Sequence, residues 1–189
     1  MRIITGRAKG LRLKTPNGMK TRPTADRIKE STFNILAGLI DFEGLSVLDL
    51  FAGTGALGLE AISRGAASCA FVDLETFSLI NYNVTKANFE NESEVIGGEV
   101  FKVMKRFKKS RRQFDLIFCD PPYHLGLWQR ALIEIDEANL LSNEGLVIIE
   151  HGADENMESA LTNLESIRQV EYGKTTAIEF FKNKVVNPE

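Results

Sequence analysis

From residue 44 onward, short apolar runs alternate with longer segments whose apolar residues recur every three or four positions. The short runs, typical of strands buried on both faces of a sheet, lie at 45–50, 68–73, 93–97, 114–119 and 145–150. The longer segments, typical of amphipathic helices, lie at 56–64, 76–89, 99–107, 126–138 and 154–163. Two last strand-like runs, 166–172 and 175–182, flank Gly173 and are expected to pair as a hairpin.

This alternation predicts an α/β fold with a doubly wound, mostly parallel sheet of seven strands, one of which is antiparallel because of the closing hairpin. Ahead of it, residues 2–5 and 11–14 are expected to form a small basic β-hairpin, and an amphipathic helix is expected just after Pro23. We therefore expect a basic N-terminal extension over residues 1–22 and an α/β domain over residues 23–189.

A glycine-rich loop follows the first of these strands and opens the next helical segment. Gly53 and Gly55 permit a positive φ and a close approach of the backbone to a ligand, while Gly58 allows the helix to pack tightly on the strand. The same three glycines match the G-x-G-x-x-G dinucleotide pattern, which alone is weak evidence for NAD. Asp49 precedes the loop and offers a partner for a methionine ammonium, and no segment remains for the substrate domain of a dehydrogenase. Both observations favour S-adenosylmethionine (SAM) over NAD.

Carboxylates also follow the next strands. Asp73 ends the run 68–73, where either cofactor would bind its ribose hydroxyls, and Glu99 with Val100 follows the run 93–97, where an adenine would be bound. Ligands of such sheets bind beyond the carboxyl ends of the strands, so these acids and Asp120 are expected along one rim. The predicted cofactor-binding residues are Asp49, Phe51, Ala52, Gly53, Thr54, Gly55, Ala56, Asp73, Glu99 and Val100.

The segment Asp120-Pro121-Pro122-Tyr123 directly follows the run 114–119. The Asp120 carboxylate and the Pro121 carbonyl are acceptors for the two N–H bonds of an exocyclic amine, and consecutive prolines hold that carbonyl rigidly. The Tyr123 ring offers a face on which an extruded base can stack. Alone, Asp-Pro-Pro is more often a turn after a strand, but the glycine loop upstream favours a catalytic role for all four residues.

The net charge of −3 conceals a segregation of charge along the chain. Nine of the 23 Lys and Arg residues lie within the first 30 residues, which contain just two acidic residues. A second basic run, 102–112, contains seven Lys or Arg residues and no acid. Such clusters are typical of phosphate contact, so the first is expected to bind a polyanion, whereas the second fits a solvated helix end equally well.

At 189 residues, with 43% hydrophobic and 26% charged residues, the chain has the composition of a globular protein with one full-sized core. It contains no run of roughly 18 apolar residues and no apolar core of signal-peptide length at its start, so we expect a cytoplasmic protein without membrane contact. Cys69 and Cys119 lie in apolar runs and are expected as buried, reduced thiols. Neither they nor His124 and His151 have metal-ligand spacing, so no metal site is expected.

The pair of a glycine loop and a later Asp-Pro-Pro-Tyr resembles class I SAM-dependent amino-methyltransferases. Further stretches make the chain similar to the RsmD family from its first strand to about residue 151, and these are residues 2–6, 10–13, 22–34 and 55–66. Asp73 stands where such sequences often carry Glu, and Glu99 where they often carry Asp, so the reach of each carboxylate differs.

The resemblance implies a Rossmann-like class I methyltransferase that uses SAM to methylate the N2 amine of one guanine in 16S ribosomal RNA, on the small ribosomal subunit or a late assembly intermediate, as a monomer without metal. The residues expected to bind RNA are Arg7, Lys9, Arg12, Arg22, Pro23, Thr24 and Arg27. Alternatives are a DNA adenine-N6 methyltransferase, a non-catalytic SAM- or RNA-binding protein, and a nicotinamide oxidoreductase. The first lacks an obvious segment for reading a major groove, and the intact Asp120–Tyr123 loop disfavours the second.

Overall fold

The computed structural model describes residues 1–16, 23–157 and 160–185. The chain divides into two compact units, Met1–Val100 and Phe101–Glu189. The helices are α1 (Pro23–Leu36), α2 (Ala56–Ser63), α3 (Phe77–Ala87), α4 (Val100–Ser110) and α5 (Leu127–Ala138), with a 3₁₀ turn, η1 (Glu90–Glu92). The strands are β1 (Ser46–Leu50), β2 (Ser68–Asp73), β3 (Ser93–Gly97), β4 (Phe114–Cys119), β5 (Leu141–Gly152), β6 (Leu164–Tyr172) and β7 (Thr176–Asn183).

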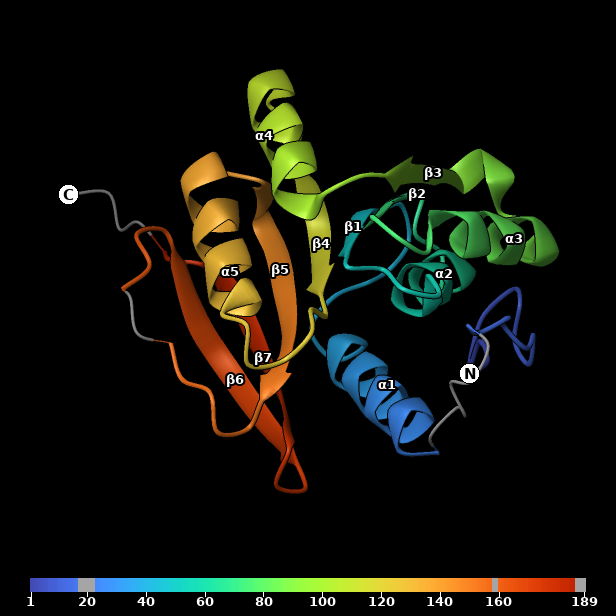
Figure 1. The fold of residues 1–189 in the computed structure, drawn as a ribbon, viewed down its shortest axis with the longest axis horizontal. Helices are drawn as coiled ribbons and strands as arrows, with labels where there is room; N and C mark the ends of the chain where they lie inside the picture. The colour runs from blue at the N-terminus through green and yellow to red at the C-terminus, as the bar shows by residue number, and fades with distance from the viewer. Residues whose placement is uncertain (17–22, 158–159, 186–189) are drawn as a thin grey trace. The chain divides into compact units, whose positions relative to one another are not determined.

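In the first unit, three parallel strands lie in the order β3, β2, β1 (Figure 1). The register pairs Leu50 with Val72 and Asp73 with Gly97, so the carboxyl ends of the three strands meet at a common edge. Helix α2 packs on β1 and β2, and α3 packs on β2 and β3. This edge is where the predicted cofactor residues of the first unit come together.

Gly58 lies where α2 packs on the sheet. A Cβ atom at this position would stand 2.5 Å from the Cys69 sulfur and would overlap the Phe71 ring. The close packing expected for this glycine is therefore confirmed. Cys69 and Cys119 are both buried, reduced thiols, as expected.

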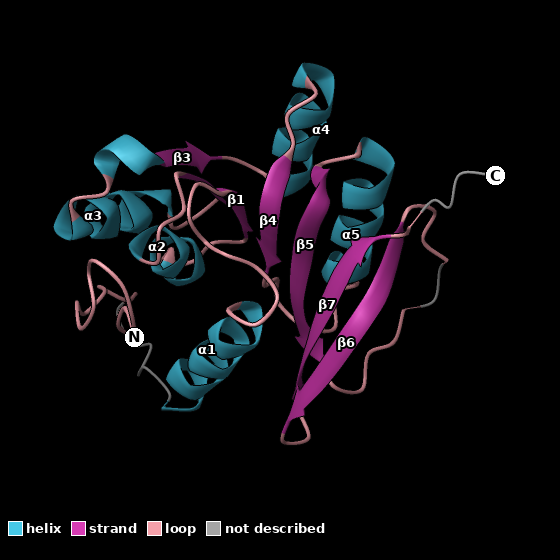
Figure 2. Ribbon diagram, turned by 180° about the vertical axis from the view of Figure 1, so that it is seen from behind, coloured by secondary structure: helices cyan, strands magenta, loops and turns pink. Residues whose placement is uncertain are grey.

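In the second unit, the strands lie in the order β4, β5, β7, β6 (Figure 2). Strand β5 runs parallel to β4, and β7 runs antiparallel to both β5 and β6. Strand β7 is therefore the antiparallel strand that the closing hairpin predicts. Helix α5 packs on β5, which is longer at both ends than the apolar run 145–150 from which it was expected.

The prediction of a helix over 154–163 is wrong, because residues 154–157 and 160–163 are not helical. The Asp136 carboxylate accepts hydrogen bonds from the backbone N–H groups of Thr162 (2.6 Å) and Asn163 (2.8 Å). Glu155 accepts a hydrogen bond from the Gly152 N–H (2.9 Å). These bonds to α5 and β5 hold the segment as a loop, and apolar spacing along the chain carries no information about them.

Residues 1–16, here called the N-terminal arm, do not form the two strands expected at 2–5 and 11–14. The arm turns back on itself through an antiparallel bridge between Arg2 and Arg12 and a hydrogen bond from Ile3 N to Leu11 O (2.9 Å). Helix α1 begins at Pro23 itself, where a missing N–H is of no consequence. Among the described residues, no helix is both long and apolar enough to cross a membrane.

Candidate active site and nucleic-acid interface

The glycine loop between β1 and α2 is held in an uncommon backbone conformation. Phe51, Gly53 and Gly55 have φ values of 58°, 57° and 76°. This region is accessible to glycine at little cost but is strained for phenylalanine. The Gly55 N–H closes the turn on the Ala52 carbonyl (2.7 Å), and the loop then runs directly into α2. A strained, glycine-rich turn at a helix start is a common way to bring backbone close to a ligand.

Asp49 lies in β1 immediately behind this loop. Its side chain is 1% exposed, and Oδ2 accepts a hydrogen bond from the Gly58 N–H (2.9 Å). Burial, assisted by the nearby Asp73 carboxylate and opposed by the Gly58 hydrogen bond, raises the pKa of Asp49 to about 7. The carboxylate thus fixes the start of α2 and is poised to ionise when a positive charge arrives. Contact with a methionine ammonium remains a prediction.

Asp73 ends β2 and binds the glycine loop from the next strand. Its Oδ2 accepts a hydrogen bond from Gly53 N (2.9 Å), and Oδ1 accepts from Glu75 N (2.9 Å) and Thr76 N (2.8 Å). Partial burial opposes ionisation, but these N–H groups outweigh it and hold the pKa of Asp73 below its usual range. The side chain is therefore a charged acceptor, partly open to solvent, at the strand end where a ribose is expected.

The third acid of this edge follows β3. Gly98 N donates to the Asp73 carbonyl (3.1 Å), which sets the chain after β3 against the end of β2. Glu99 is half-buried, and Val100 is buried at the first position of α4. The first unit thus brings Asp49, Asp73 and Glu99 to one edge, as the strand pattern predicts. Asp120 belongs to the second unit, and its place on a common rim remains a prediction.

In the second unit, exposed and buried residues alternate along the Asp120–Tyr123 loop, which follows β4. Asp120 and Pro122 are exposed, Pro121 is buried and Tyr123 is half-buried. Because the strand before the loop is buried and the next residue after Asp120 is packed, the Asp120 side chain is directed outward from a rigid base. An exposed carboxylate on such a support can accept an N–H bond from a substrate amine.

Hydrogen bonds of the Tyr123 hydroxyl hold the outer end of the tyrosine ring in place. It donates a hydrogen bond to Glu150 Oε1 and lies 3.2 Å from Thr176 Oγ1. Burial and the adjacent Glu150 raise the pKa of Tyr123 well above its ordinary value, and burial also raises the pKa of Glu150. The ring therefore has a fixed orientation that its hydroxyl sets.

A second group of side chains supports the end of β5, beside Glu150. The His151 ring is 2% exposed and stacks on Trp128 with centroids 4.4 Å apart. Its Nε2 lies 3.6 Å from Glu179, and its Nδ1 lies 2.9 Å from the Gly152 carbonyl. Burial lowers the pKa of His151, but Glu179 and the carbonyl together outweigh it and raise the pKa above its ordinary value.

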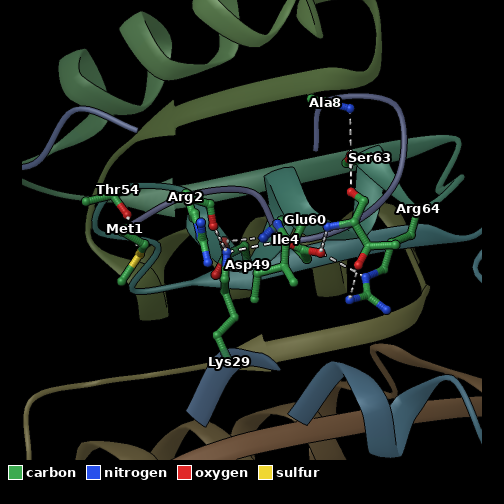
Figure 3. Close-up of polar contacts among 12 residues, drawn as sticks. Met1, Arg2, Ile4, Ala8, Lys29, Asp49, Thr54, Glu60, Ser63 and Arg64 are labelled. Carbon is green, nitrogen blue, oxygen red and sulfur yellow. Dashed lines mark hydrogen bonds and ion pairs between the residues drawn. The ribbon is translucent and has the colours of Figure 1, made fainter. Parts of the chain in front are cut away.

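The N-terminal arm is attached to α2 through Glu60. This carboxylate is fully buried and accepts hydrogen bonds from the backbone N–H groups of Ile4 (2.7 Å) and Thr5 (3.0 Å). It also pairs with Lys29 of α1 (3.2 Å) and Arg64 (2.9 Å), so that one side chain joins the arm to both helices (Figure 3). Burial lowers the pKa of Lys29, although Glu60 opposes that shift.

Asn83 of α3 attaches the same arm to the glycine loop. Its side chain is fully buried, and Nδ2 donates hydrogen bonds to the carbonyls of Lys14 (3.0 Å) and Thr54 (2.9 Å). Its Oδ1 accepts a hydrogen bond from Lys14 N (2.8 Å). The arm and the predicted cofactor loop therefore share a buried hydrogen-bonding partner.

The residues expected to bind RNA differ in their availability. Lys9, Arg12 and Arg27 are exposed. Arg7 pairs with Glu92 (2.9 Å) and lies over the Phe89 ring, so part of its charge is already compensated. Arg22 lies outside the described residues, while Pro23 and Thr24 open α1, and their side chains are outside the described part as well. Basic residues of the run 102–112 line the exposed side of α4, namely Lys102, Lys105, Arg106, Lys108 and Lys109.

Residues 1–181 match the family described as Conserved hypothetical protein 95. Ribosomal RNA small subunit methyltransferase D of Haemophilus influenzae is 34% identical over 157 residues, which cover 82% of this chain and 80% of that protein. The solved structure of the Escherichia coli protein yhhF, described as a methyltransferase, matches with a TM-score of 0.82 and 26% identity over 97% of this chain and 98% of that one. The chain belongs to the RsmD family.

The fold of this RsmD-family chain is that of the class I methyltransferases. The SAM-dependent methyltransferase from Agrobacterium tumefaciens matches it with a TM-score of 0.62 at 17% identity, over 87% of this chain and 63% of that one. The predicted fold class is thus confirmed. Over residues 1–16, 23–157 and 160–185, no three His, Cys, Asp or Glu side chains gather in a way that could hold a metal ion.

Sequence reasoning missed four polar residues that hold the candidate loops or the elements next to them within each unit of this RsmD-family chain. They are Glu60, Asn83, Glu150 and His151, which are each buried or half-buried in an otherwise apolar setting. Each bonds to a partner at least 27 residues away in sequence, apart from contacts within its own element. In the sequence these residues stand out only as polar residues within apolar segments. That observation does not show which residue each of them binds.

Proposed function

We propose that this RsmD-family protein transfers the methyl group of SAM to the N2 amine of a guanine in 16S ribosomal RNA of the small subunit, as a cytoplasmic monomer. The glycine loop with Asp49, Asp73 and Glu99 would bind the cofactor in the first unit. The Asp120–Tyr123 loop in the second unit would bind the target base. The N-terminal arm, with Lys9 and Arg12 exposed, would contact RNA phosphates.

The observation that carries the proposal is the geometry of the Asp120–Tyr123 loop. An exposed carboxylate stands next to a packed, rigid proline, and a tyrosine ring fixed by Glu150 follows two residues later. These are an acceptor pair and a stacking face, which a planar base with an exocyclic amine requires. A relative of this chain, the ribosomal RNA small subunit methyltransferase D of Haemophilus influenzae, supports ribosomal RNA of the small subunit as the substrate class.

SAM supplies an electrophilic methyl group on a positively charged sulfur. Asp73 would accept hydrogen bonds from the ribose, and ionised Asp49 would compensate positive charge behind the loop. Asp120 and the Pro121 carbonyl would accept the two N–H bonds of guanine N2, which directs the nitrogen lone pair toward the methyl carbon. When guanine N2 takes the methyl group and S-adenosylhomocysteine leaves, the amine would release one proton, which the Asp120 carboxylate or water would accept.

The direct test uses small subunits from cells that lack the modification. Incubation with methyl-labelled SAM, followed by digestion to nucleosides, should give labelled N2-methylguanosine at one molar equivalent or less per subunit. Label in N6-methyladenosine, or none in RNA although the protein binds SAM, would refute the assignment to guanine N2.

A further inference from the structure

Helix α3 carries an exposed aromatic side chain among basic groups. Tyr82 is 50% exposed, and with Asn81, Thr85 and Lys86 it lines a shallow hollow that is widely open to solvent. The proposed catalytic and cofactor residues include none of these four.

The N-terminal arm supplies further positive charge at this hollow. The Lys14 ammonium lies 4.7 Å from the centroid of the Tyr82 ring, and Lys86 Nζ donates a hydrogen bond to the Arg12 carbonyl (2.7 Å). The side chain of Asn83, the next residue after Tyr82, forms hydrogen bonds with both the backbone N–H and the backbone carbonyl of Lys14. The arm and α3 are thus joined at this point, and the joint is rigid because Asn83 is buried.

The charge at this surface is of one sign. Residues 1–16 and 77–87 contain no Asp or Glu, while Lys14 lies over the Tyr82 ring, Lys86 lines the same hollow, and the exposed Arg12 is joined to Lys86 through its carbonyl. Aromatic faces combined with lysine and arginine are the chemistry that binds single-stranded nucleic acid, because the ring stacks on a base while the cations bind the backbone. Asn81 and Thr85 add amide and hydroxyl groups within reach of a base edge.

We propose that the hollow lined by Tyr82 and Lys86 on α3, with Arg12 and Lys14 of the N-terminal arm, is a subsite for one nucleotide of single-stranded RNA outside the reaction centre. Tyr82 stacks on the base, and Lys14, Lys86 and Arg12 contact the adjacent phosphates. The subsite holds the RNA strand that flanks the methylated guanine, so this proposal rests on the proposed function and extends its substrate contacts to α3.

The first experiment measures binding of a fluorescein-labelled oligouridylate by fluorescence anisotropy. Tyr82→Ala should weaken the affinity about tenfold or more, because base stacking is lost, while Tyr82→Phe should stay within about twofold of the wild type. Lys14→Gln should lower the log–log salt slope by about one, since one phosphate contact is removed. Leu39→Ala, which removes another exposed apolar side chain of the first unit, and Lys182→Gln, which removes a charge from β7, serve as controls.

The second experiment separates this subsite from the proposed activity. With unmethylated small subunits, Tyr82→Ala should raise KM about tenfold, leave kcat and SAM affinity unchanged, and be rescued by Tyr82→Phe. Unchanged oligouridylate affinity in Tyr82→Ala, or equal loss for a labelled RNA duplex, would overturn the subsite and leave methyl transfer standing. A wild type that binds oligouridylate through Tyr82 but methylates no guanine would overturn the proposed function and leave the subsite standing.

Discussion

The glycine loop of the first unit and the Asp120–Tyr123 loop of the second are fixed by different kinds of hydrogen bond. Backbone N–H groups hold the first, as Gly53 and Gly58 donate to Asp73 and Asp49. A contact between two side chains holds the second, as Tyr123 donates to Glu150 of β5, which is 27 residues further along the chain. The difference has a consequence for mutation. Changes at the first loop should alter cofactor affinity, and changes at the second should alter the orientation of the base and the rate of transfer.

The largest expected effect concerns the arm that adjoins the first loop. Glu60→Ala removes the carboxylate that pairs with Lys29 and leaves that ammonium buried without a charged partner, with the Arg2 carbonyl (2.6 Å) as a remaining acceptor. We expect a loss of about 3–5 kcal/mol in the free energy of unfolding, measured by urea denaturation. Glu165→Ala, which breaks an exposed pair with Lys182, is the matched control and should cost less than about 1 kcal/mol. Equal losses in the two variants would show that backbone bonds alone stabilise this region.

The next effect is on cofactor affinity. Asp73→Ala removes the acceptor of Gly53 N and the expected acceptor of the ribose hydroxyls. SAM should bind more weakly by about 1.5–3 kcal/mol, as measured by isothermal titration calorimetry. Asp154→Ala, at an exposed carboxylate of the second unit, should leave SAM affinity unchanged. An Asp73→Ala variant that folds and binds SAM as the wild type does would place the ribose elsewhere.

The next prediction concerns the hydrogen bond between Tyr123 and Glu150, which holds the Asp120–Tyr123 loop. Tyr123→Phe retains the ring but deprives the largely buried Glu150 of its donor, so we expect a loss of about 1–2 kcal/mol in unfolding free energy. Tyr82→Phe removes a hydroxyl from an exposed ring and should change stability by less than about 0.5 kcal/mol. If both variants unfold at the same urea concentration as the wild type, the hydroxyl does not position the Tyr123 ring.

The smallest effect is on the pH dependence of cofactor binding. The pKa of Asp49 is raised to about 7 in the ligand-free protein, and a bound cation would favour the ionised form. Binding of SAM should therefore release a proton below pH 7, and its affinity should rise by up to about tenfold between pH 6 and 8. Titration calorimetry in buffers of different ionisation enthalpy measures this release. Asp49→Asn should abolish the pH dependence, and its persistence in that variant would assign it to another group.

The same contrast explains which features the sequence predicts. Gly53 and Gly55 act through their own backbone, and parallel pairing of β1, β2 and β3 brings Asp73 to the glycine loop, so the strand and glycine pattern suffices for them. Glu150 meets Tyr123 because β5 continues to Gly152 and pairs there with Thr176. That register depends on the whole antiparallel pairing, and no short motif encodes it.

The missing helix at 154–163 has a related origin. Apolar spacing favours a helix there, but the Asp136 carboxylate accepts hydrogen bonds from the backbone N–H groups of Thr162 and Asn163, which a helix would use internally. Tertiary contacts thus outweigh a weak local preference. The charge of the arm was evident from composition, whereas its attachment through Glu60 and Asn83 was not, because each of these side chains looks ordinary in an amphipathic helix.

The most direct test compares Asp120→Ala with the wild type in single-turnover methylation of under-modified small subunits at saturating SAM. Because Asp120 is exposed, its removal should leave folding and SAM affinity intact. We expect the rate of N2-methylguanosine formation to fall about 100-fold or more, since the target amine loses an acceptor that orients it. A near-normal rate in this variant, with SAM binding unchanged, would contradict the assignment of the Asp120–Tyr123 loop to the chemical step.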